Sequence, residues 1–461
     1  MLRPLLLAAL IGAVAPPAHA QVNGALRAYA WANEASAASY TPDPRYAYNA
    51  SGGAVTAHRT GTGQYYVTFG GVDGTGGTVQ VSAYGPPQTD ATCSVEYWEP
   101  SPLEIYVKCV DTGSTDPVDA RYTVAYFRAD ADAVGLRYAY ADRPADASAL
   151  LVGDTVHNPG GVVSSTRLDE GAYRVRFVGV PEDEATRGVV LVTPVSSSAH
   201  CAALSWAFNS GGLDVRVDCS DAGDLIDSRF TVLFVSKATA GETPGFAYTH
   251  ADTPGADPYS PAADGSYVFG GGSVLVERVL SGRYEVQFGG LGSSEPGGLA
   301  LVTATTGAGE GAGVRHCTVG GWNTTGPDVS VAVNCGGETG GISDSHFAAL
   351  FLWPTRPGAT AAAGGPDIGP DTGDGAAALR LAGPNPTVGR AAFAVDLTAP
   401  ADARLDVFDA VGRRALALDL GPRSAGTHAV EVDASALPAG VYVARLVAGE
   451  AVRTARFTVA R

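Results

Sequence analysis

The segment Arg59–Gly71 decides the fold, and it reads RTGTGQYYVTFGG. Two later segments keep its pattern: RLDEGAYRVRFVG at 167–179 and RVLSGRYEVQFGG at 278–290. All three share an Arg, then a Gly, then an alternating Tyr-x-Val-x-Phe, and finally a second Gly. Successive residues of a strand point to opposite faces, so Tyr, Val and Phe share one face and polar residues take the other. The pattern predicts three related β-strands.

The flanks of these strands repeat in the same order. Each copy continues with Cys-x4-Trp and Val-x-Cys, and it closes with an Asp shortly before an aromatic residue. So many matches in register indicate one structural unit of roughly 110 residues in three copies. We expect β repeats over residues 21–128, 129–240 and 241–353, followed by a linker over 354–378.

Each copy contains roughly eight short candidate strands between Gly-, Pro- and Asp-rich turns, and no long helical periodicity. Hydrophobic residues make up 45% of the chain, which is enough for a packed core. In the first copy the candidates lie near Ala28–Ala32, Arg45–Asn49, Ala54–Arg59, Tyr65–Phe69, Val79–Ala83, Cys93–Trp98, Leu103–Cys109 and Arg121–Phe127. We expect an all-β protein built from three tandem antiparallel repeats.

Two architectures fit this pattern. In the first, each copy is a separate β-sandwich or barrel, and its opening and closing strands pair with each other. In the second, all strands form one closed propeller of six four-stranded blades. The propeller requires the first opening strand, Ala28–Ala32, to pair with the last closing strand, Phe347–Trp353.

The six cysteines come as three pairs, one per repeat. The pairs are Cys93 and Cys109, Cys201 and Cys219, and Cys317 and Cys335. No His recurs beside all three pairs, so zinc lacks ligands, and we expect disulfides between neighbouring strands. Disulfides imply an oxidising compartment.

An Arg and an Asp also recur in each copy, inside or beside apolar strand signatures. They are Arg59 with Asp119, Arg167 with Asp227, and Arg278 with Asp344. One structural ion pair per repeat is our leading interpretation, because a half-buried Arg–carboxylate pair fixes geometry. The alternative is three identical acidic binding sites.

The recurring aromatic residues have two interpretations. They are Tyr65, Tyr173 and Tyr284, and Trp98, Trp206 and Trp322. They could form a platform on which sugar rings stack. We expect them in the core instead, because each Tyr shares a strand face with Val and Phe. Trp31 and Trp353 do not recur and fit either environment.

Residues 1–20 have the pattern of a secretory signal peptide. Arg3 supplies the charged start, Leu5–Val14 is a short apolar stretch, and Ala18-His19-Ala20 is a cleavage site. We expect cleavage between Ala20 and Gln21. The apolar stretch is too short to span a bilayer, which takes about 20 residues, and no other stretch is long enough.

The segment 379–461 carries a separate set of motifs. They are Pro384-Asn385-Pro386, Leu405-Asp406-Val407-Phe408-Asp409 with Gly412-Arg413, Ala425-Gly426-Thr427-His428, Leu437-Pro438-Ala439-Gly440-Val441-Tyr442, and Arg456-Phe457-Thr458-Val459. In this order they resemble the C-terminal sorting domain of proteins exported by the type IX secretion system of Bacteroidetes-like bacteria. The resemblance implies an Ig-like β-sandwich, recognition by type IX-like sorting machinery, and a secreted or outer-surface protein that has crossed the periplasm. The three repeats resemble only uncharacterised secreted repeat proteins.

The net charge of −17 disfavours nucleic acid and anionic membranes as partners. The sequence contains no Gly-x-Ser-x-Gly, no His-Glu-x-x-His and no phosphate-binding Gly loop, so we assign no catalytic, cofactor or metal residue.

Our leading hypothesis is a non-catalytic adhesin, or a glycan- or protein-binding protein, outside the cell. An extracellular hydrolase with its site on one propeller face, and a passive surface-layer component, are the alternatives. A repeat-built binding protein should expose equivalent aromatic residues in all three copies, whereas an enzyme should show one asymmetric cluster of acids.

Overall fold

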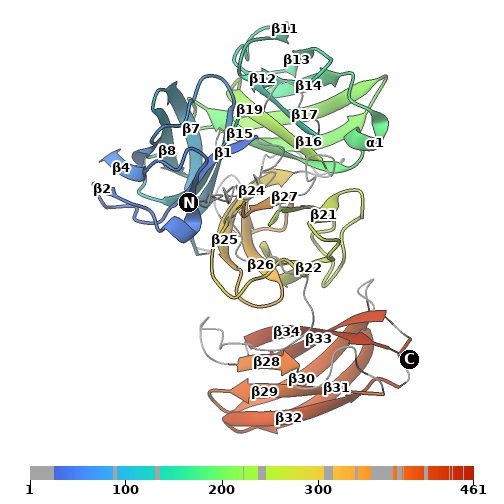
Figure 1. Cartoon of the computed structure of the whole chain (residues 1–461). Helices are drawn as coiled ribbons and strands as arrows, with labels where there is room; N and C mark the ends of the chain where they lie inside the picture. Colours follow the sequence, from blue (N-terminus) through green and yellow to red (C-terminus); the bar gives the residue numbers. More distant parts are fainter. Residues whose placement is uncertain are drawn as a thin grey trace, which may run out of the picture.

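The computed structural model describes residues 25–86, 91–129, 135–221, 223–236, 245–305, 315–337, 341–354, 377–381, 387, 389–409, 414–435, 437–438, 440–449 and 451–460. The regular secondary structure of the described chain is almost entirely β-strand, with one short α-helix, so the all-β prediction is confirmed. Figure 1 shows three groups of strands, coloured blue, green and yellow to orange, and the C-terminal strands in red.

The strands fall into three sets that follow the sequence repeats, which we call repeats 1, 2 and 3. Repeat 1 contains β1 (Leu26–Ala32), β2 (Ser39–Tyr40), the 3-10 helix η2 (Pro44–Tyr46), β3 (Ala47–Asn49), β4 (Val55–Gly61), β5 (Gln64–Phe69), β6 (Thr78–Tyr84), β7 (Ala91–Pro100), β8 (Leu103–Asp111) and β9 (Arg121–Phe127). Repeat 2 contains β10 (Leu136–Ala141), β11 (Ser148–Leu151), β12 (Val156–His157), β13 (Val163–Asp169), β14 (Ala172–Val178), α1 (Glu182–Ala185), β15 (Gly188–Val195), β16 (His200–Phe208), β17 (Gly212–Asp221), β18 (Asp224–Leu225) and β19 (Arg229–Ser236). Repeat 3 contains β20 (Ala247–Ala251), β21 (Ser266–Val268), β22 (Val274–Leu280), β23 (Arg283–Phe288), β24 (Leu299–Thr305), β25 (His316–Asn323), β26 (Val329–Gly336) and β27 (His346–Leu352). Each candidate strand of the first copy overlaps a strand in the structure, but Arg45 and Tyr46 of the candidate Arg45–Asn49 belong to the 3-10 helix η2.

Every repeat consists of two facing groups of strands. The inner groups have the orders β3-β1-β9-β6, β12-β10-β19-β15 and β21-β20-β27-β24. The outer groups have the orders β2-β4-β5-β8-β7, β11-β13-β14-β17-β16 and β22-β23-β26-β25. The two groups of one repeat enclose a hydrophobic core of their own, because period-two alternation gives each strand an apolar face.

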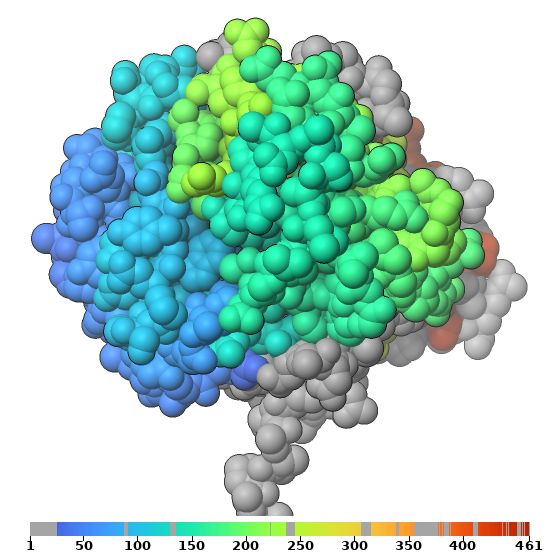
Figure 2. Space-filling view, turned by 90° about the horizontal axis from the view of Figure 1, so that it is seen from above, coloured from blue at the N-terminus to red at the C-terminus, as the bar shows by residue number. Residues whose placement is uncertain are grey.

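The inner group of each repeat continues, edge to edge, into the outer group of another repeat. Parallel contacts make these joins: β15 with β7, β24 with β16, and β6 with β25. We call them the 1–2, 2–3 and 3–1 seams. The three repeats therefore share three mixed sheets and form a ring. Figure 2 shows the blue surface of repeat 1 in contact with the green surface of repeat 2.

Neither expected architecture describes this arrangement in full. Opening and closing strands pair inside each repeat, as β1 with β9, β10 with β19, and β20 with β27. The pairing of Ala28–Ala32 with Phe347–Trp353, which the propeller requires, is wrong. The physical reason is that β1 already lies between β3 and β9 and has no free edge.

The second face of each inner group points to the centre of the ring. On β6, Val79, Val81 and Ala83 belong to the core of repeat 1, whereas Gln80 and Ser82 are buried on the opposite face. Apolar residues from all three inner groups, including Tyr29, Leu191 and Leu301, form the central core. The strands of the inner groups are therefore buried on both faces.

Three equivalent hydroxyls connect the inner groups across this centre, and we call them the central hydroxyl ring. They are Ser82, Thr193 and Thr303. Ser82 Oγ donates to the Val302 carbonyl at 2.8 Å, Thr303 Oγ1 donates to the Val192 carbonyl at 2.9 Å, and Thr193 Oγ1 accepts from the Val81 N–H at 3.2 Å. The contacts run from repeat 1 to 3, from 3 to 2, and from 2 to 1, which closes a circuit.

The C-terminal segment forms two further sheets around one core. Their strands are β28 (Ala377–Leu381), β29 (Arg390–Leu397), β30 (Ala401–Asp409), β31 (Arg414–Arg423), β32 (Gly426–Asp433), β33 (Gly440–Ala448) and β34 (Ala451–Val459). The sheet orders are β28-β29-β32 and β31-β30-β33-β34. A sandwich of three and four strands is compatible with the Ig-like fold that the sorting-domain resemblance implies.

Candidate functional site

The solvent face of the outer group of repeat 1 carries a row of four aromatic side chains. His58 on β4 lies opposite Tyr66 on β5, Tyr66 lies opposite Tyr106 on β8, and Tyr106 lies opposite Tyr97 on β7. Each side chain alternates with core residues, such as Val67 on β5. We call these four residues the aromatic ladder.

The four rings stack on one another across the strands. Ring centroids are 4.4 Å apart for His58–Tyr66, 5.2 Å for Tyr66–Tyr106 and 4.3 Å for Tyr97–Tyr106, with interplanar angles of 11°, 26° and 17°. Neighbouring rings therefore cover each other's faces, and their edges are left toward solvent. Tyr97 ends the row on β7 and is 47% exposed, so it offers the most accessible ring.

Polar groups border the aromatic ladder. Glu104 accepts hydrogen bonds from the hydroxyls of Tyr106 at 2.9 Å and Thr68 at 3.2 Å, and the His58 ring lies 3.2 Å from the Thr56 hydroxyl. The bond to Glu104 holds the pKa of Tyr106 well above its ordinary value, so the phenol keeps its proton. The surface thus combines apolar rings with hydrogen-bonding groups of fixed position.

Repeats 2 and 3 place other residues at the four ladder positions. In repeat 2 they are Thr166, Arg174, Arg216 and Ser205. In repeat 3 they are Glu277, Glu285, Ala332 and Gly321. Equivalent exposed aromatic residues in all three copies, which we expected of a repeat-built binding protein, are not present at these positions. The feature is specific to repeat 1.

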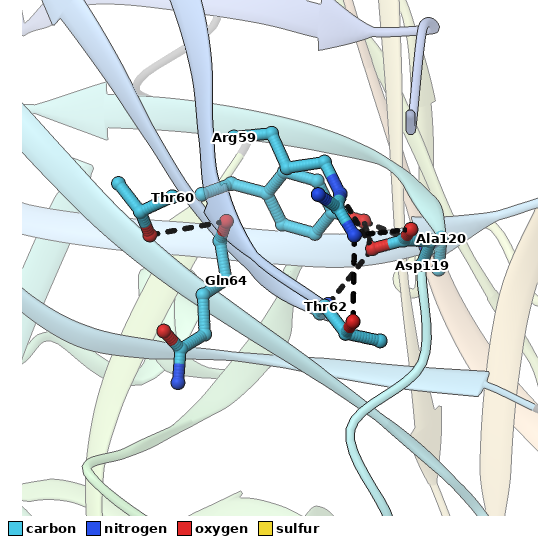
Figure 3. A network of polar contacts seen from close by, with 8 residues as sticks. Arg59, Thr60, Thr62, Gln64, Asp119 and Ala120 are labelled. Atoms are coloured by element: carbon cyan, nitrogen blue, oxygen red, sulfur yellow. Dashed lines mark hydrogen bonds and ion pairs between the residues drawn. The ribbon is translucent and has the colours of Figure 1, made fainter. Parts of the chain in front are cut away.

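The recurring Arg and Asp residues do meet, and a Tyr joins them. Figure 3 shows the group in repeat 1: Arg59 Nε and Nη2 donate to the two oxygens of Asp119 at 2.9 and 2.8 Å. The Gly63 N–H and the Tyr65 hydroxyl donate to the same carboxylate at 2.9 and 3.0 Å. The Ala120 N–H in turn donates to the Tyr65 hydroxyl at 3.0 Å. We call this arrangement the carboxylate node.

The other two repeats contain the same node. Arg167, Gly171 and Tyr173 donate to Asp227, and Arg278, Gly282 and Tyr284 donate to Asp344. The Arg59 hydrogen bond, together with those from Gly63 and Tyr65, holds the pKa of Asp119 below its usual value despite partial burial. Donors from the protein already surround the carboxylate, which favours the structural interpretation over three acidic binding sites.

The three predicted disulfides are confirmed. They link Cys93 to Cys109, Cys201 to Cys219, and Cys317 to Cys335. Each bond joins residues that lie directly opposite each other on neighbouring strands of an outer group. The outer groups, whose solvent faces carry the ladder positions, are thus cross-linked within themselves.

The recurring tyrosines are buried in the repeat cores, as expected. The recurring tryptophans differ, because they are only half-buried and lie at the seams. Trp98 contacts Tyr140 at 5.8 Å, Trp206 contacts His250 at 4.6 Å, and Trp322 contacts Trp31 at 5.5 Å between ring centroids. Each indole also donates to a glycine carbonyl. Trp353 is buried in the core of repeat 3.

Several predicted features lie outside the described residues. They are the signal peptide 1–20 with Ala20 and Gln21, most of the linker 354–378, and Pro384, Asn385, Pro386 and Gly412. Of the remaining sorting motif, Asp409 ends β30, Gly440 begins β33, and Tyr442 is buried and donates to the Pro438 carbonyl at 2.8 Å. Their role in sorting stays a prediction.

Two searches of the described residues bear on function. No three or more His, Cys, Asp or Glu side chains gather in the described parts so as to hold a metal ion. Among the same residues, no helix has the length and apolar character that a membrane crossing requires.

The aromatic ladder was not predicted from the sequence. The signal is the position of Tyr66 and Tyr106, which alternate with core residues and therefore lie on the solvent face. Comparison with protein families, with curated proteins and with solved structures finds no match to this chain. The function must therefore be inferred from the residues themselves.

Proposed function

We propose that the protein is a non-catalytic extracellular binding protein that holds an uncharged polysaccharide on the outer face of repeat 1. The aromatic ladder carries this proposal. Tyrosine provides a large contact area at low cost in conformational entropy, and its hydroxyl gives a polar handle. A sugar has an apolar face of C–H groups that can pack on the accessible Tyr97 ring, and its hydroxyls can bond to the phenols and to Glu104.

A structural role for the ladder must be weighed against this. Cross-strand aromatic pairs stabilise a sheet by roughly 0.2–1 kcal/mol each. Repeats 2 and 3, however, form the same outer strands without aromatic residues at these positions. Sheet formation therefore does not require the ladder, which supports a role in binding.

Charge favours a neutral ligand. The chain has a net charge of −17, and Glu104 lies directly beside the rings. An anionic polymer would be repelled at this face, whereas an uncharged polysaccharide would not. The three disulfides indicate an oxidising, extracytoplasmic setting, where such polymers are found.

The route to that setting is also part of the proposal. We infer export through the signal peptide at residues 1–20, followed by type IX-like sorting through residues 379–461. The support is the motif order in the sequence. Deletion of residues 379–461 should leave the protein in the periplasm of a type IX-competent host; continued appearance outside the cell would contradict this route.

The test is binding of the full chain to an array of uncharged and acidic polysaccharides, with release of reducing ends measured on every hit. We expect binding without release. Tyr97→Ala should weaken it roughly tenfold or more, since removal of an aromatic anchor costs on the order of 2 kcal/mol. Arg174→Ala removes the side chain at the Tyr66 position of repeat 2 and should change nothing. Binding that survives Tyr97→Ala combined with Tyr106→Ser refutes the site, and release of reducing ends refutes a non-catalytic role.

A further inference from the structure

Histidine residues gather where repeat 2 meets repeat 3. At the 2–3 seam, the His250 ring of repeat 3 packs on Trp206 of repeat 2, with centroids 4.6 Å apart. A second contact between the same two repeats joins His200 at the start of β16 and His316 at the start of β25, with centroids 5.6 Å apart. Both contacts lie between repeats rather than within one.

Neither of the other two seams carries histidine at both of these positions. Tyr140 occupies the position of His250 at the 1–2 seam, and Trp31 occupies it at the 3–1 seam. Thr92 holds the place of His200 in repeat 1, and His316 holds it in repeat 3. The three seams have equivalent backbone contacts but different side chains at these two positions. The 2–3 seam is distinct because it carries histidine at both of them.

His200 has little access to water or to anions. His200 is 4% exposed, and neither of its ring nitrogens has a hydrogen-bond partner among the described residues. Burial lowers its pKa to about 4; His316 adds to this effect and Asp221 opposes it.

His250 is only partly buried, and its Nε2 lies 3.2 Å from the Thr305 hydroxyl. Burial lowers its pKa to about 4, His346 acts in the same direction, and Asp252 and Asp264 oppose it. For both rings the closed seam therefore prefers the neutral form.

We propose that acid opens the ring at the 2–3 seam, while the 1–2 and 3–1 seams stay closed. Protonation of His200 and His250 would place two positive charges in a buried contact between repeats. Separation of repeats 2 and 3 at this seam brings both imidazolium groups to water. Each histidine pKa is lowered from its ordinary value of 6.5 to about 4, so the closed seam favours the neutral form of each ring over the protonated form by about 300-fold.

Hydrogen–deuterium exchange of the full chain at pH 7 and pH 4.5, with times scaled for the chemical exchange rate, tests this proposal. We expect acid to raise exchange at least tenfold in β16, β20 and β24. The matched strands at the 1–2 seam, β7, β10 and β15, should keep their protection. Equal loss of protection at all three seams, or no loss at the 2–3 seam, overturns the proposal.

The repeats themselves supply the variants. His200→Thr combined with His250→Tyr installs the residues of repeat 1 and of the 1–2 seam, and it should abolish the acid response at β16 and β20. Tyr140→His places an imidazole at the 1–2 seam against Trp98 and should make β7 and β10 acid-sensitive. An unchanged acid response in the first variant contradicts the assignment, and so does an insensitive 1–2 seam in the second.

Discussion

Replacement of Asp227 by Asn tests whether the carboxylate node is structural. The substitution keeps the size of the side chain but removes its charge. The Gly171 N–H and the Tyr173 hydroxyl both donate to Oδ1, so the amide oxygen can keep these two bonds. The new NH2 group then faces the Arg167 guanidinium, which is itself a donor. We expect Arg167 to lose its contacts with Oδ2 and the attraction of the negative charge, although its Nε can still donate to the oxygen at the Oδ1 position.

The expected cost follows from this geometry. Arg167 contacts the carboxylate at 2.9 Å, and the side chains of Arg167 and Asp227 are 29% and 25% exposed. A hydrogen bond to a charged group contributes about 1.5–3 kcal/mol to the free energy of unfolding, and partial exposure reduces this through solvent screening. We expect Asp227→Asn to destabilise the protein by about 2 kcal/mol. Asp119→Asn and Asp344→Asn should cost similar amounts, because their nodes have the same contacts.

Urea unfolding of the full chain at pH 7 measures this cost, with Asp224→Asn as an exposed control in the same repeat. The pKa of Asp227 lies below 3.8, because hydrogen bonds from Arg167, Gly171 and Tyr173 outweigh burial. Its stabilisation is therefore present above pH 3.8 and is lost as the pH falls through the lower folded value. Wild type and variant should converge at low pH. A loss at pH 7 no larger than that of the control would refute the structural role of the node.

Three further outcomes are expected. Thr303→Val breaks the central hydroxyl ring at the Val192 carbonyl and should lower the free energy of unfolding by about 1–2 kcal/mol in urea, since a buried acceptor loses its donor. Replacement of Cys201 and Cys219 by Ala opens a loop of 18 residues and should cost about 3 kcal/mol by the chain-entropy relation, and reduction of the wild type should reproduce the shift. The urea midpoint of unfolding should decrease as the pH is lowered from 6.5 to 4. Over this range the unfolded chain protonates His200 and His250 while the folded chain keeps them neutral, which lowers the free energy of unfolding by up to about 3 kcal/mol for each histidine; a flat profile would contradict this.

Features that recur in the sequence were predictable. Val67 and Phe69 alternate with polar positions on β5, and the same alternation in three copies gave the strands, the repeats and the buried tyrosines. The Arg–Asp pairs of the carboxylate node followed from recurrence as well, because an Arg and an Asp that recur together inside apolar patterns need each other for burial, whereas the Tyr and Gly donors were not predicted. The disulfides followed in the same way.

Features that depend on contact between repeats were not predictable. The 3–1 seam joins Tyr84 to Val319, and nothing in either strand marks its partner, because one register point leaves no periodic signal. The half-buried position of Trp322 has the same origin, since its contact with Trp31 exists only after the ring has closed. The aromatic ladder leaves no recurring signal in the sequence, because repeats 2 and 3 carry other residues at its four positions.

The division between inner and outer groups suggests where function can change in this fold. Inner strands are buried on both faces, so most of their positions contribute to a repeat core or to the central core. Outer strands are constrained by core packing on one face only. On their solvent face, the same four positions carry rings in repeat 1, two arginines in repeat 2 and two glutamates in repeat 3. Three copies of one unit therefore keep a common core and present three chemically different surfaces. Binding to one ligand through three equal sites is incompatible with this divergence, whereas a single polysaccharide site on repeat 1 accords with it.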